Sequence, residues 1–578
     1  MTRLSILNVG IFAVFVSCAH AQTVPVVPAV RAYSPAYELE RTKETLRSKA
    51  TDARIRRFSD EYEKEKLKDA SAKKKDKAPE KKAAADKKIM KLKRLIFDRS
   101  ELLPDSFLEG IASRYEGKEI GLNDIGAIVR EVDREYKDRG YFAAKAYVPN
   151  QDVRDHILKI NLIEGKIDRI TVKENKSTSE NFVRRNLGVE SGDRLNVKEL
   201  QDNILMFNAA NDIKARIAME PGEKFATTDL DVIVEEPQRV SVSAFADNAG
   251  QKSTGVYRAG AFASVRSLTG YRDNLNFGGV VTEGSNAFFG SFDIPEPVFD
   301  SRIGFGADYS DTEIVGGDLK ALDVTGNFYN YYFYIKRPVY VTDSFVNNLN
   351  FTANFKNGAS YIGDFRTQKV YTDTLSLSWD SLKLFAGGYL YNQLSVTKGA
   401  KLFDGTRSFW RFNYNGEFQQ SFLDDFALNV KAKAQYTEQD FLPSSEQFQI
   451  GGVNSVRGYT EGMLVGDKGF AVMNELQYDI KPLIKEADWL NSAKVYAFFD
   501  FGHVYAKDSN NLKNENEAFI YSTGVGARAG LFGRLDANFT VAFPLKEHKY
   551  YESDEDVEFL FFIQSSIWYE QVICSEKS

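Results

Sequence analysis

Residues 426–437 read FALNVKAKAQYT, and apolar and polar side chains alternate along them with a period of two. One face of this stretch is apolar or aromatic throughout, and it consists of Phe426, Leu428, Val430, Ala432, Ala434 and Tyr436. The opposite face is mostly polar and includes Asn429, Lys431, Lys433 and Gln435. Successive side chains of a β-strand point to opposite sides. Because lysine is costly in lipid and well solvated in water, the pattern predicts a strand between lipid and an aqueous lumen.

The same alternation recurs along the C-terminal part of the chain. Val240, Val242, Ala244 and Ala246 form one face of a second such stretch, and residues 374–380 form a third. Residues 239–568 number 330, and at roughly 20 residues for each strand and its turn they predict about 16 strands. The sequence therefore predicts a transmembrane antiparallel β-barrel over residues 239–568, with a large soluble β-sandwich or propeller as the alternative.

The composition excludes a helical membrane protein. The mean hydropathy of the 578 residues is −0.37, whereas each helical span needs about 20 consecutive apolar residues. Barrel strands average to a polar score because only one face meets lipid. The 13% aromatic content and the 41 glycines favour this class.

The first 21 residues resemble a signal peptide. Arg3 precedes an apolar stretch over residues 4–17, and Ala19-His20-Ala21 has the pattern of a cleavage site. A short membrane anchor is the alternative. Cleavage after Ala21 leaves Cys574 as the only cysteine, so an exported chain has no intrachain disulfide.

Residues 22–90 are predicted to form an N-terminal helix followed by a lysine-rich linker. Residues 36–68 have many charged neighbours three or four positions apart, a spacing that supports helix. Over residues 41–90 there are 18 Lys and Arg against 10 Asp and Glu, although the whole chain carries −6. The helix is either a solvated charged segment without a role or a movable element beside or inside a pore.

Residues 91–165 and 166–236 are predicted to form two small α+β modules, each with the order helix, strand, strand. In the first module, Asn123 is the expected cap of a helix whose apolar face consists of Ile125, Ile128, Val129, Val132 and Tyr136. In the second module, Asn196 and Glu199 have the spacing of a capping box.

No enzyme motif is present in the sequence. The histidines that remain after cleavage are His156, His503 and His548, and none has a partner at the spacing of metal ligands. The chain has no HExxH, CxxC, GxSxG or P-loop pattern. We therefore predict no catalytic residue, no metal, no cofactor and no nucleic-acid partner, and we do not expect an enzyme.

One glycine-rich loop stands out within the predicted barrel, and it reads GGVNSVRGY over residues 451–459. Farther along, Val495, Ala497, Phe499 and Phe501 form an apolar face, which directs Asp500 toward the lumen. An arginine that is carried into a partly dehydrated lumen needs a carboxylate partner. Asp500 is the best candidate to pair with Arg457, and an ordinary surface-loop charge is the alternative.

Several motifs in the same order resemble those of the outer-membrane transporters of two-partner secretion. This TpsB-type family of hemolysin activator or secretion proteins belongs to the superfamily of barrels that carry POTRA modules. The loop motif is Val456, Arg457, Gly458 and Tyr459, preceded by LPSSEQF over residues 442–448. The second barrel motif is Phe498, Phe499, Asp500, Phe501 and Gly502. Residues 163–167 resemble the end of a first POTRA module.

The resemblance implies a 16-stranded outer-membrane barrel of a Gram-negative bacterium, two periplasmic POTRA modules and an N-terminal helix that plugs the pore. It implies that the loop folds into the lumen, where Arg457 pairs with Asp500. The implied partners are membrane lipid and one secreted exoprotein of the TpsA type, and the barrel is expected to be monomeric. Residues 569–578 extend beyond the usual end of such barrels and are expected to form a C-terminal tail, with an extension of the last strand as the alternative.

Three functions follow from these patterns. Export of a partner exoprotein without nucleotide hydrolysis is the leading prediction. Insertion or assembly of other outer-membrane barrels is the first alternative, and passive diffusion through a porin is the second. The two modules favour export, because a porin needs no docking arm.

Overall fold

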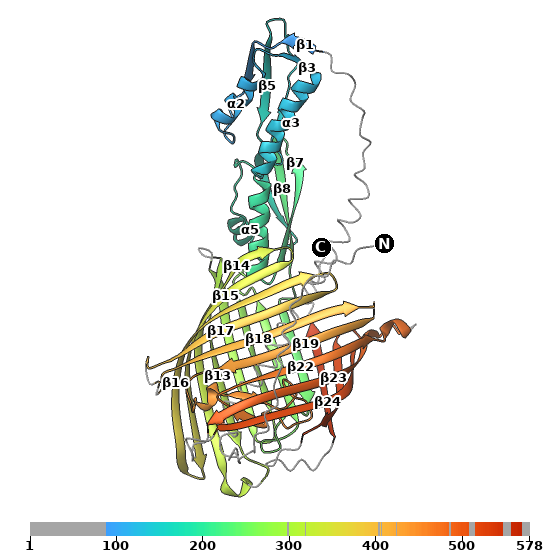
Figure 1. Cartoon of the computed structure of the whole chain (residues 1–578). Coiled ribbons are helices and arrows are strands. Elements are labelled where there is room, and N and C mark those ends of the chain that lie inside the picture. The colour runs from blue at the N-terminus through green and yellow to red at the C-terminus, as the bar shows by residue number, and fades with distance from the viewer. Residues whose placement is uncertain are drawn as a thin grey trace, which may run out of the picture.

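A slender arm of helices and short strands stands on one end of a large barrel in the computed structural model (Figure 1). The structure describes residues 88–296, 300–317, 319–402, 405, 407–423, 425–484, 487–507, 515–546 and 557–568. The predicted signal peptide over residues 1–21, the helix over residues 36–68 and the tail over residues 569–578 lie outside these residues. No helix in the described ranges is long and apolar enough to cross a membrane.

The first module packs two helices against a small sheet. Its elements are β1 (Lys88–Lys91), β2 (Arg94–Phe97), α2 (Asp105–Tyr115), β3 (Glu119–Gly121), α3 (Leu122–Asp138), β4 (Lys145–Tyr147) and β5 (Ile157–Ile163). Strand β5 lies between β2, which is parallel to it, and β4, which is antiparallel. The predicted apolar face of α3 is confirmed, since Ile128, Val132 and Tyr136 are fully buried.

One local prediction for this module is wrong, and two of its elements were not predicted. Helix α3 begins at Leu122 rather than after an Asn123 cap, because β3 leads directly into the helix and the Asp124 carboxylate accepts the Gly121 N–H at 2.8 Å. Helix α2 was not predicted, because only Leu108 and Ile111 along it are buried. Strand β1 also begins within the range expected for the linker.

The second module repeats this plan. It contains β6 (Lys166–Lys173), α4 (Glu180–Leu187), α5 (Val197–Ala210), β7 (Lys214–Pro221) and β8 (Thr227–Glu235). The sheet order is β6-β8-β7. The predicted cap of α5 is confirmed, because the Asn196 side chain accepts the Glu199 N–H at 3.2 Å. The expected order of helix, strand, strand is present as α5, β7 and β8, and β6 and the short helix α4 precede it.

A buried carboxylate joins the two modules. Glu164, at the end of β5, accepts hydrogen bonds from the Tyr136 hydroxyl at 2.9 Å and from the Glu101 N–H at 3.1 Å. Arg194 of the second module lies 3.5 Å from Glu164 and 2.8 Å from Glu101. These contacts fix the direction in which the second module continues from the first.

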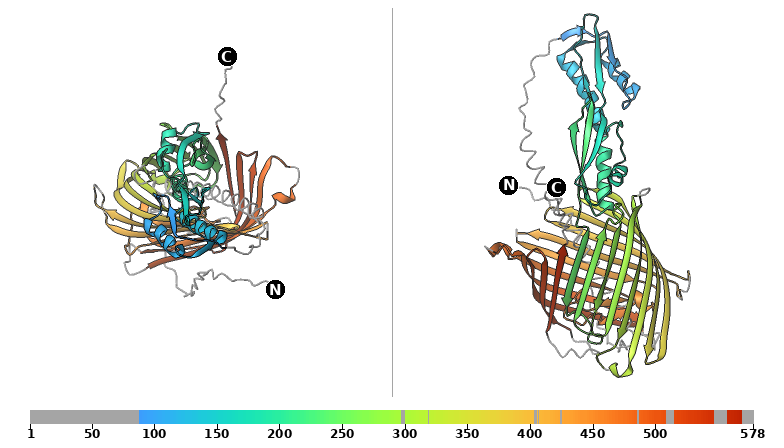
Figure 2. Two further views of the ribbon diagram at one scale, coloured as in Figure 1. Left: turned by 90° about the horizontal axis from the view of Figure 1, so that it is seen from above. Right: turned by 180° about the vertical axis from the view of Figure 1, so that it is seen from behind.

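Sixteen antiparallel strands close into the barrel, which confirms the predicted fold class. They are β9 (Val240–Asp247), β10 (Arg258–Arg266), β11 (Asn274–Val281), β12 (Ser285–Glu296), β13 (Ser301–Glu313), β14 (Val324–Thr342), β15 (Phe345–Ile362), β16 (Phe365–Phe385), β17 (Gly388–Ala400), β18 (Phe409–Phe422), β19 (Phe426–Tyr436), β22 (Lys468–Asp479), β23 (Leu490–Lys507), β24 (Glu515–Leu531), β25 (Leu535–Pro544) and β26 (Glu558–Trp568). Strand β26 pairs with β9, and Figure 2 shows these two strands side by side.

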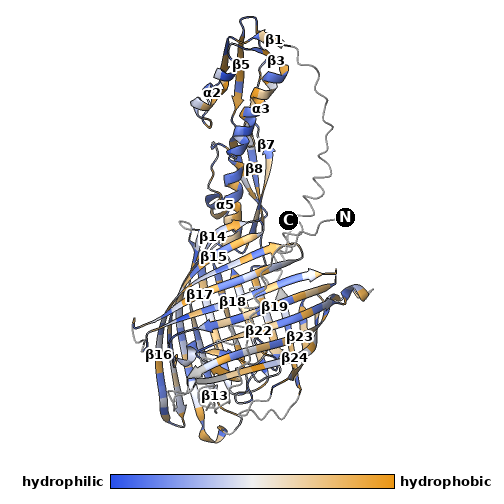
Figure 3. Ribbon diagram, in the orientation of Figure 1, coloured by the Kyte–Doolittle hydropathy of each residue, from blue (hydrophilic) through white to orange (hydrophobic). Residues whose placement is uncertain are grey.

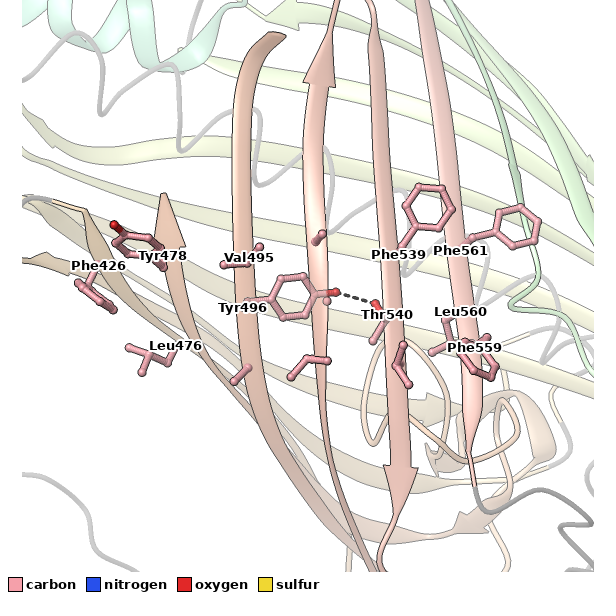
Figure 4. Close-up of a pocket in the computed structure, with 15 residues that line it drawn as sticks. Phe426, Leu476, Tyr478, Val495, Tyr496, Phe539, Thr540, Phe559, Leu560 and Phe561 are labelled. Atoms are coloured by element: carbon pink, nitrogen blue, oxygen red, sulfur yellow. Dashed lines mark hydrogen bonds between the residues drawn. The ribbon is translucent and has the colours of Figure 1, made fainter. Parts of the chain in front are cut away.

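Side chains alternate between the two faces of this wall, as expected for β19. Leu428 and Tyr436 are exposed on the outside, whereas Asn429 and Gln435 are buried on the inside. Apolar and polar positions alternate along the strands in Figure 3. The outer wall has an apolar depression of about 750 Å³ over β19 and β22–β26, whose floor is backed by the hydrogen bond of 2.6 Å between the Tyr496 and Thr540 hydroxyls (Figure 4).

The second module is locked to the barrel by the turn between β10 and β11. Arg272 in this turn is fully buried, and its Nε donates to Asp212 Oδ1 at 2.8 Å. Glu236, between β8 and β9, accepts the N–H groups of Ser177 and Thr178, both at 2.9 Å, and lies 3.8 Å from Arg272, so it also links the module to this turn. Burial raises the pKa of Glu236, but these hydrogen bonds outweigh it and hold the pKa below its ordinary value.

We expect Arg272→Ala to loosen this junction. The change removes one partner of a buried ion pair, which costs about 3–5 kcal/mol when burial is complete. Limited proteolysis of the purified protein should then release the arm from the barrel. Arg169→Ala is the matched control, because the pair of Arg169 with Asp229 is exposed and such pairs contribute about 0–1 kcal/mol. Equal cleavage of both variants would contradict the lock.

The same junction should weaken in acid. Because the pKa of Glu236 is lower in the folded protein, its contribution is complete above its unfolded pKa and is lost as the pH falls through the folded value. We expect constant resistance to an acid-active protease between about pH 7 and pH 5 and faster release of the arm below about pH 4. Glu236→Gln should abolish this acid sensitivity, whereas a pH profile unchanged in that variant would show that other groups govern it.

Candidate functional lumen loop

The connection between β19 and β22 folds back into the barrel from the end far from the two modules. It contains a short helical turn, η2 (Ser444–Glu446), and the strands β20 (Phe448–Ile450) and β21 (Leu464–Gly466), which pair with each other. The tip over residues 451–463 requires glycine at position 452. Gly452 has φ +91°, and a Cβ there would lie 1.8 Å from Glu461 Oε2. The loop therefore folds as a compact hairpin and not as an extended surface loop.

The structure brings Arg457 and Asp500 together. The Arg457 Nε lies 2.6 Å from Asp500 Oδ2, and its second terminal nitrogen lies 2.8 Å from Asp500 Oδ1. The Arg457 side chain is 5% exposed and that of Asp500 is fully buried. Two parallel contacts between a guanidinium and a carboxylate are strong and fix orientation. The loop tip is therefore held against β23 by a directional, dehydrated ion pair.

A second carboxylate and a second arginine complete this cluster. Glu475 on β22 accepts from Arg457 at 2.5 Å, and Arg528 on β24 binds both oxygens of Glu475 at 2.8 Å. The four groups carry two positive and two negative charges, so the buried site is neutral. Neither Glu475 nor Arg528 lies within the loop motif or the second barrel motif.

The other residues of the loop motif surround this cluster. Val456 is fully buried and packs with Ile450 and Ile520. Gly458 lies against Ala542 and Pro544. The Tyr459 hydroxyl lies 2.9 Å from the Tyr521 carbonyl oxygen and accepts the Lys546 N–H at 3.2 Å. The motif is thus anchored to β24 and to the end of β25.

The second barrel motif is split between the two faces of β23. The Phe498 ring lies inside, 3.8 Å from the Arg457 guanidinium carbon, a distance at which cation–π attraction adds to the ion pair. Gly502 also faces the loop, and a Cβ there would approach Val456 to 3.1 Å. Phe499 and Phe501 alternate with them and contact each other, and Phe499 is 46% exposed on the outer wall. These two residues therefore serve the lipid face and not the loop.

No group of three or more His, Cys, Asp or Glu side chains within the described ranges is arranged to hold a metal ion. The charged groups of the lumen site are instead paired with one another. Their arrangement fixes a loop in place and offers no nucleophile next to a base.

Comparisons with known proteins identify this architecture. The family described as haemolysin secretion/activation protein ShlB/FhaC/HecB matches residues 226–529, and the ShlB-type POTRA domain matches residues 90–165. The chain belongs to this family. The resemblance drawn from the sequence motifs is thereby confirmed.

Individual relatives agree with this assignment. The heme/hemopexin transporter protein HuxB of Haemophilus influenzae is 27% identical over 78% of this chain and 82% of its own length. The outer membrane transporter CdiB of Dickeya dadantii is 21% identical over 80% of this chain and 84% of its own length. The solved structure of CdiB from Escherichia coli shares the fold, with a TM-score of 0.70, 17% identity and coverage of 92% and 99% of the two chains.

Family members are transporters. The barrel lies in the outer membrane, with the POTRA modules in the periplasm. Strand β9 begins on the periplasmic side, where the second module ends, and successive strands run in opposite directions. The connection between β19 and β22 therefore lies on the outer side, and the loop enters the lumen from there.

We expect Asp500→Ala to release the loop tip. The test uses Ser455→Cys as a reporter, in a protein whose Cys574 is replaced, because Ser455 is only 2% exposed beside the cluster. Loss of the buried partner should raise labelling by an impermeant maleimide at least about tenfold. Glu475→Gln should raise it less, because Asp500 still holds Arg457 through two contacts.

Glu417→Ala is the control for this labelling. Glu417 is a lumen carboxylate that accepts from Tyr389 and Asn429, both of which belong to the wall. Labelling that rises equally in the control and in Asp500→Ala would show general loosening of the barrel rather than release of the tip.

Proposed function

We propose that the protein exports one secreted partner protein, of the TpsA type, through its barrel. The observation that supports this most directly is the combination of two periplasmic modules, joined rigidly to the barrel, with a lumen loop held by ion pairs. Relatives with this organisation include a heme/hemopexin transporter and a hemolysin transporter of Proteus mirabilis. A client that binds the modules is delivered to the periplasmic mouth of the lumen.

The chemistry of the lumen loop suits a reversible closure. Part of the loop packs on the wall through apolar side chains, and the neutral ion-pair cluster adds a specific geometry at a small net energy. An extended client brings its own polar groups and water into the lumen, which weakens the pairing of Arg457 with Asp500. We propose that this competition moves the loop during transport.

In this proposal the protein is not an enzyme and hydrolyses no nucleotide. The energy for export comes instead from the client, which folds outside the cell and cannot return through the lumen.

The two other functions make different demands on the chain. An insertase for barrel proteins is suggested by the similarity to BamA from Haemophilus ducreyi, with a TM-score of 0.50 and 14% identity, and this supports the fold alone. A diffusion porin would not need the buried contacts that hold the second module to the barrel. Export uses both the arm and the loop, so we favour it.

We expect a deletion strain to retain one large exoprotein and to keep its other outer-membrane barrels. The wild-type gene should restore secretion, and Arg457→Ala should not, because loss of one partner of a buried pair costs about 3–5 kcal/mol. The variant should still insert, since the lipid-facing residues are unchanged. Immunoblots of secreted and outer-membrane fractions measure both outcomes. General loss of barrels in the deletion strain would support the insertase instead.

We also propose that residues 36–68 form the helix that limits conductance through the lumen. A variant lacking residues 36–86 removes this segment and leaves β1 intact, because β1 begins at Lys88. Single-channel recordings should show larger or more frequent openings than those of the full chain. Equal currents would show that the segment plays no part in closing the pore.

A further inference from the structure

A second buried charge cluster lies at the base of the lumen loop, away from the Arg457 site. Its centre is Glu446, the last residue of η2, whose side chain is 1% exposed. Glu446 Oε1 lies 2.8 Å from the Lys356 ammonium nitrogen on β15, and Oε2 lies 3.0 Å from Arg411 on β18. One loop carboxylate therefore neutralises two cations from two separate strands of the wall.

The backbone of the same residue adds two further contacts. The Glu446 carbonyl oxygen accepts from Arg411 at 3.1 Å and from the Gln435 amide on β19 at 2.8 Å. Close by, the Asp467 carboxylate accepts the N–H groups of Phe441 and Leu442, both at 2.9 Å, which closes the base of the hairpin. Glu446 is thus the point at which the loop base is fastened to the wall.

The two charge clusters bind the loop to different strands of the wall. The base cluster involves β15, β18 and β19 through Lys356, Arg411 and Gln435. The tip cluster involves β22, β23 and β24, which follow β19 along the closed wall. The loop is therefore fastened at two separate points, and breaking the tip cluster alone leaves its base in place.

We propose that Glu446 is a positioning residue, the second latch of the lumen loop, and that the loop clears the lumen fully only when both latches release. This inference rests on the proposed function, in which the client passes through the lumen. Without the Glu446 carboxylate, the Lys356 ammonium and the Arg411 guanidinium lose the anion that they share. Each then favours water or another anion over the loop.

Glu446→Gln tests the latch in single-channel recordings of the purified full chain in planar bilayers. The amide keeps the shape of the side chain and removes its charge, so we expect the time spent in the larger open state to rise at least about tenfold. Glu446→Asp should restore much of the closure. Heat-modifiable migration in gels verifies that each variant is a folded barrel, and Arg411→Gln replaces Glu446→Gln if that variant does not insert.

Glu417→Gln is the matched control. Glu417 is also a buried lumen carboxylate, it lies on β18 like Arg411, and its hydrogen-bond and ion-pair partners Tyr389, Asn429 and Lys431 all belong to the wall. Openings of this variant should equal those of the wild type. If Glu446→Gln behaves like the control, the latch is refuted and Glu446 only balances the charge of the wall.

A double-mutant cycle separates a latch from a local defect. If both clusters hold one loop, the effect of Glu446→Gln on opening must change when Arg457→Ala is also present, whereas Glu417→Gln must act independently of Arg457→Ala. Independent action of Glu446→Gln would overturn the proposal.

These recordings need no client, so they are independent of the export function. Normal secretion of the exoprotein by the deletion strain would refute export and leave the latch standing, whereas unchanged openings of Glu446→Gln would refute the latch and leave export standing.

Discussion

Lipid cannot hydrogen-bond the polypeptide backbone, and this constraint governs the rest of the molecule. Every N–H and C=O within the membrane needs a partner, and a closed set of antiparallel strands supplies one without leaving an edge. The pairing of β26 with β9 completes the circle. The Phe245 ring stacks on Phe562 across this joint, and beside it Asp247 of β9 forms a buried ion pair at 2.8 Å with Arg258 of β10. Closure forces each strand to present one face outward and the other inward, which creates a polar interior.

That polar interior permits an arrangement that an ordinary protein core rarely tolerates. Charged side chains from the loop and the wall are buried, yet each lies against an opposite charge. Arg457 is paired with Asp500 and Glu475, and Glu446 is paired with Lys356 and Arg411. Pairs of this kind add little net stability, but they require exact placement. The loop therefore has a defined resting position.

Period-two patterning was sufficient to predict the barrel, its approximate strand number and the inward direction of Asp500, because the alternation of faces is a property of each strand alone. The apolar face of α3 and the cap of α5 were predicted because each depends on residues close together in the sequence. Short helices such as α2 were not, because few of their residues are buried and tertiary packing decides them. Arg528 and Lys356 were missed because their partners Glu475 and Glu446 come close only after distant parts of the chain fold together. No single stretch of sequence shows that these side chains come close together.

The tip cluster has an uneven composition that matters once the loop has moved. Three of its charges, Asp500, Glu475 and Arg528, belong to the wall, and only Arg457 travels with the loop. After withdrawal, Arg528 still neutralises Glu475, whereas Asp500 is left without its guanidinium. The vacant socket thus carries one uncompensated negative charge. The free Asp500 carboxylate attracts Arg457 back to its resting position. It can equally bind a basic side chain of a chain that passes through the lumen. Basic residues of the passing chain therefore compete with the return of the loop.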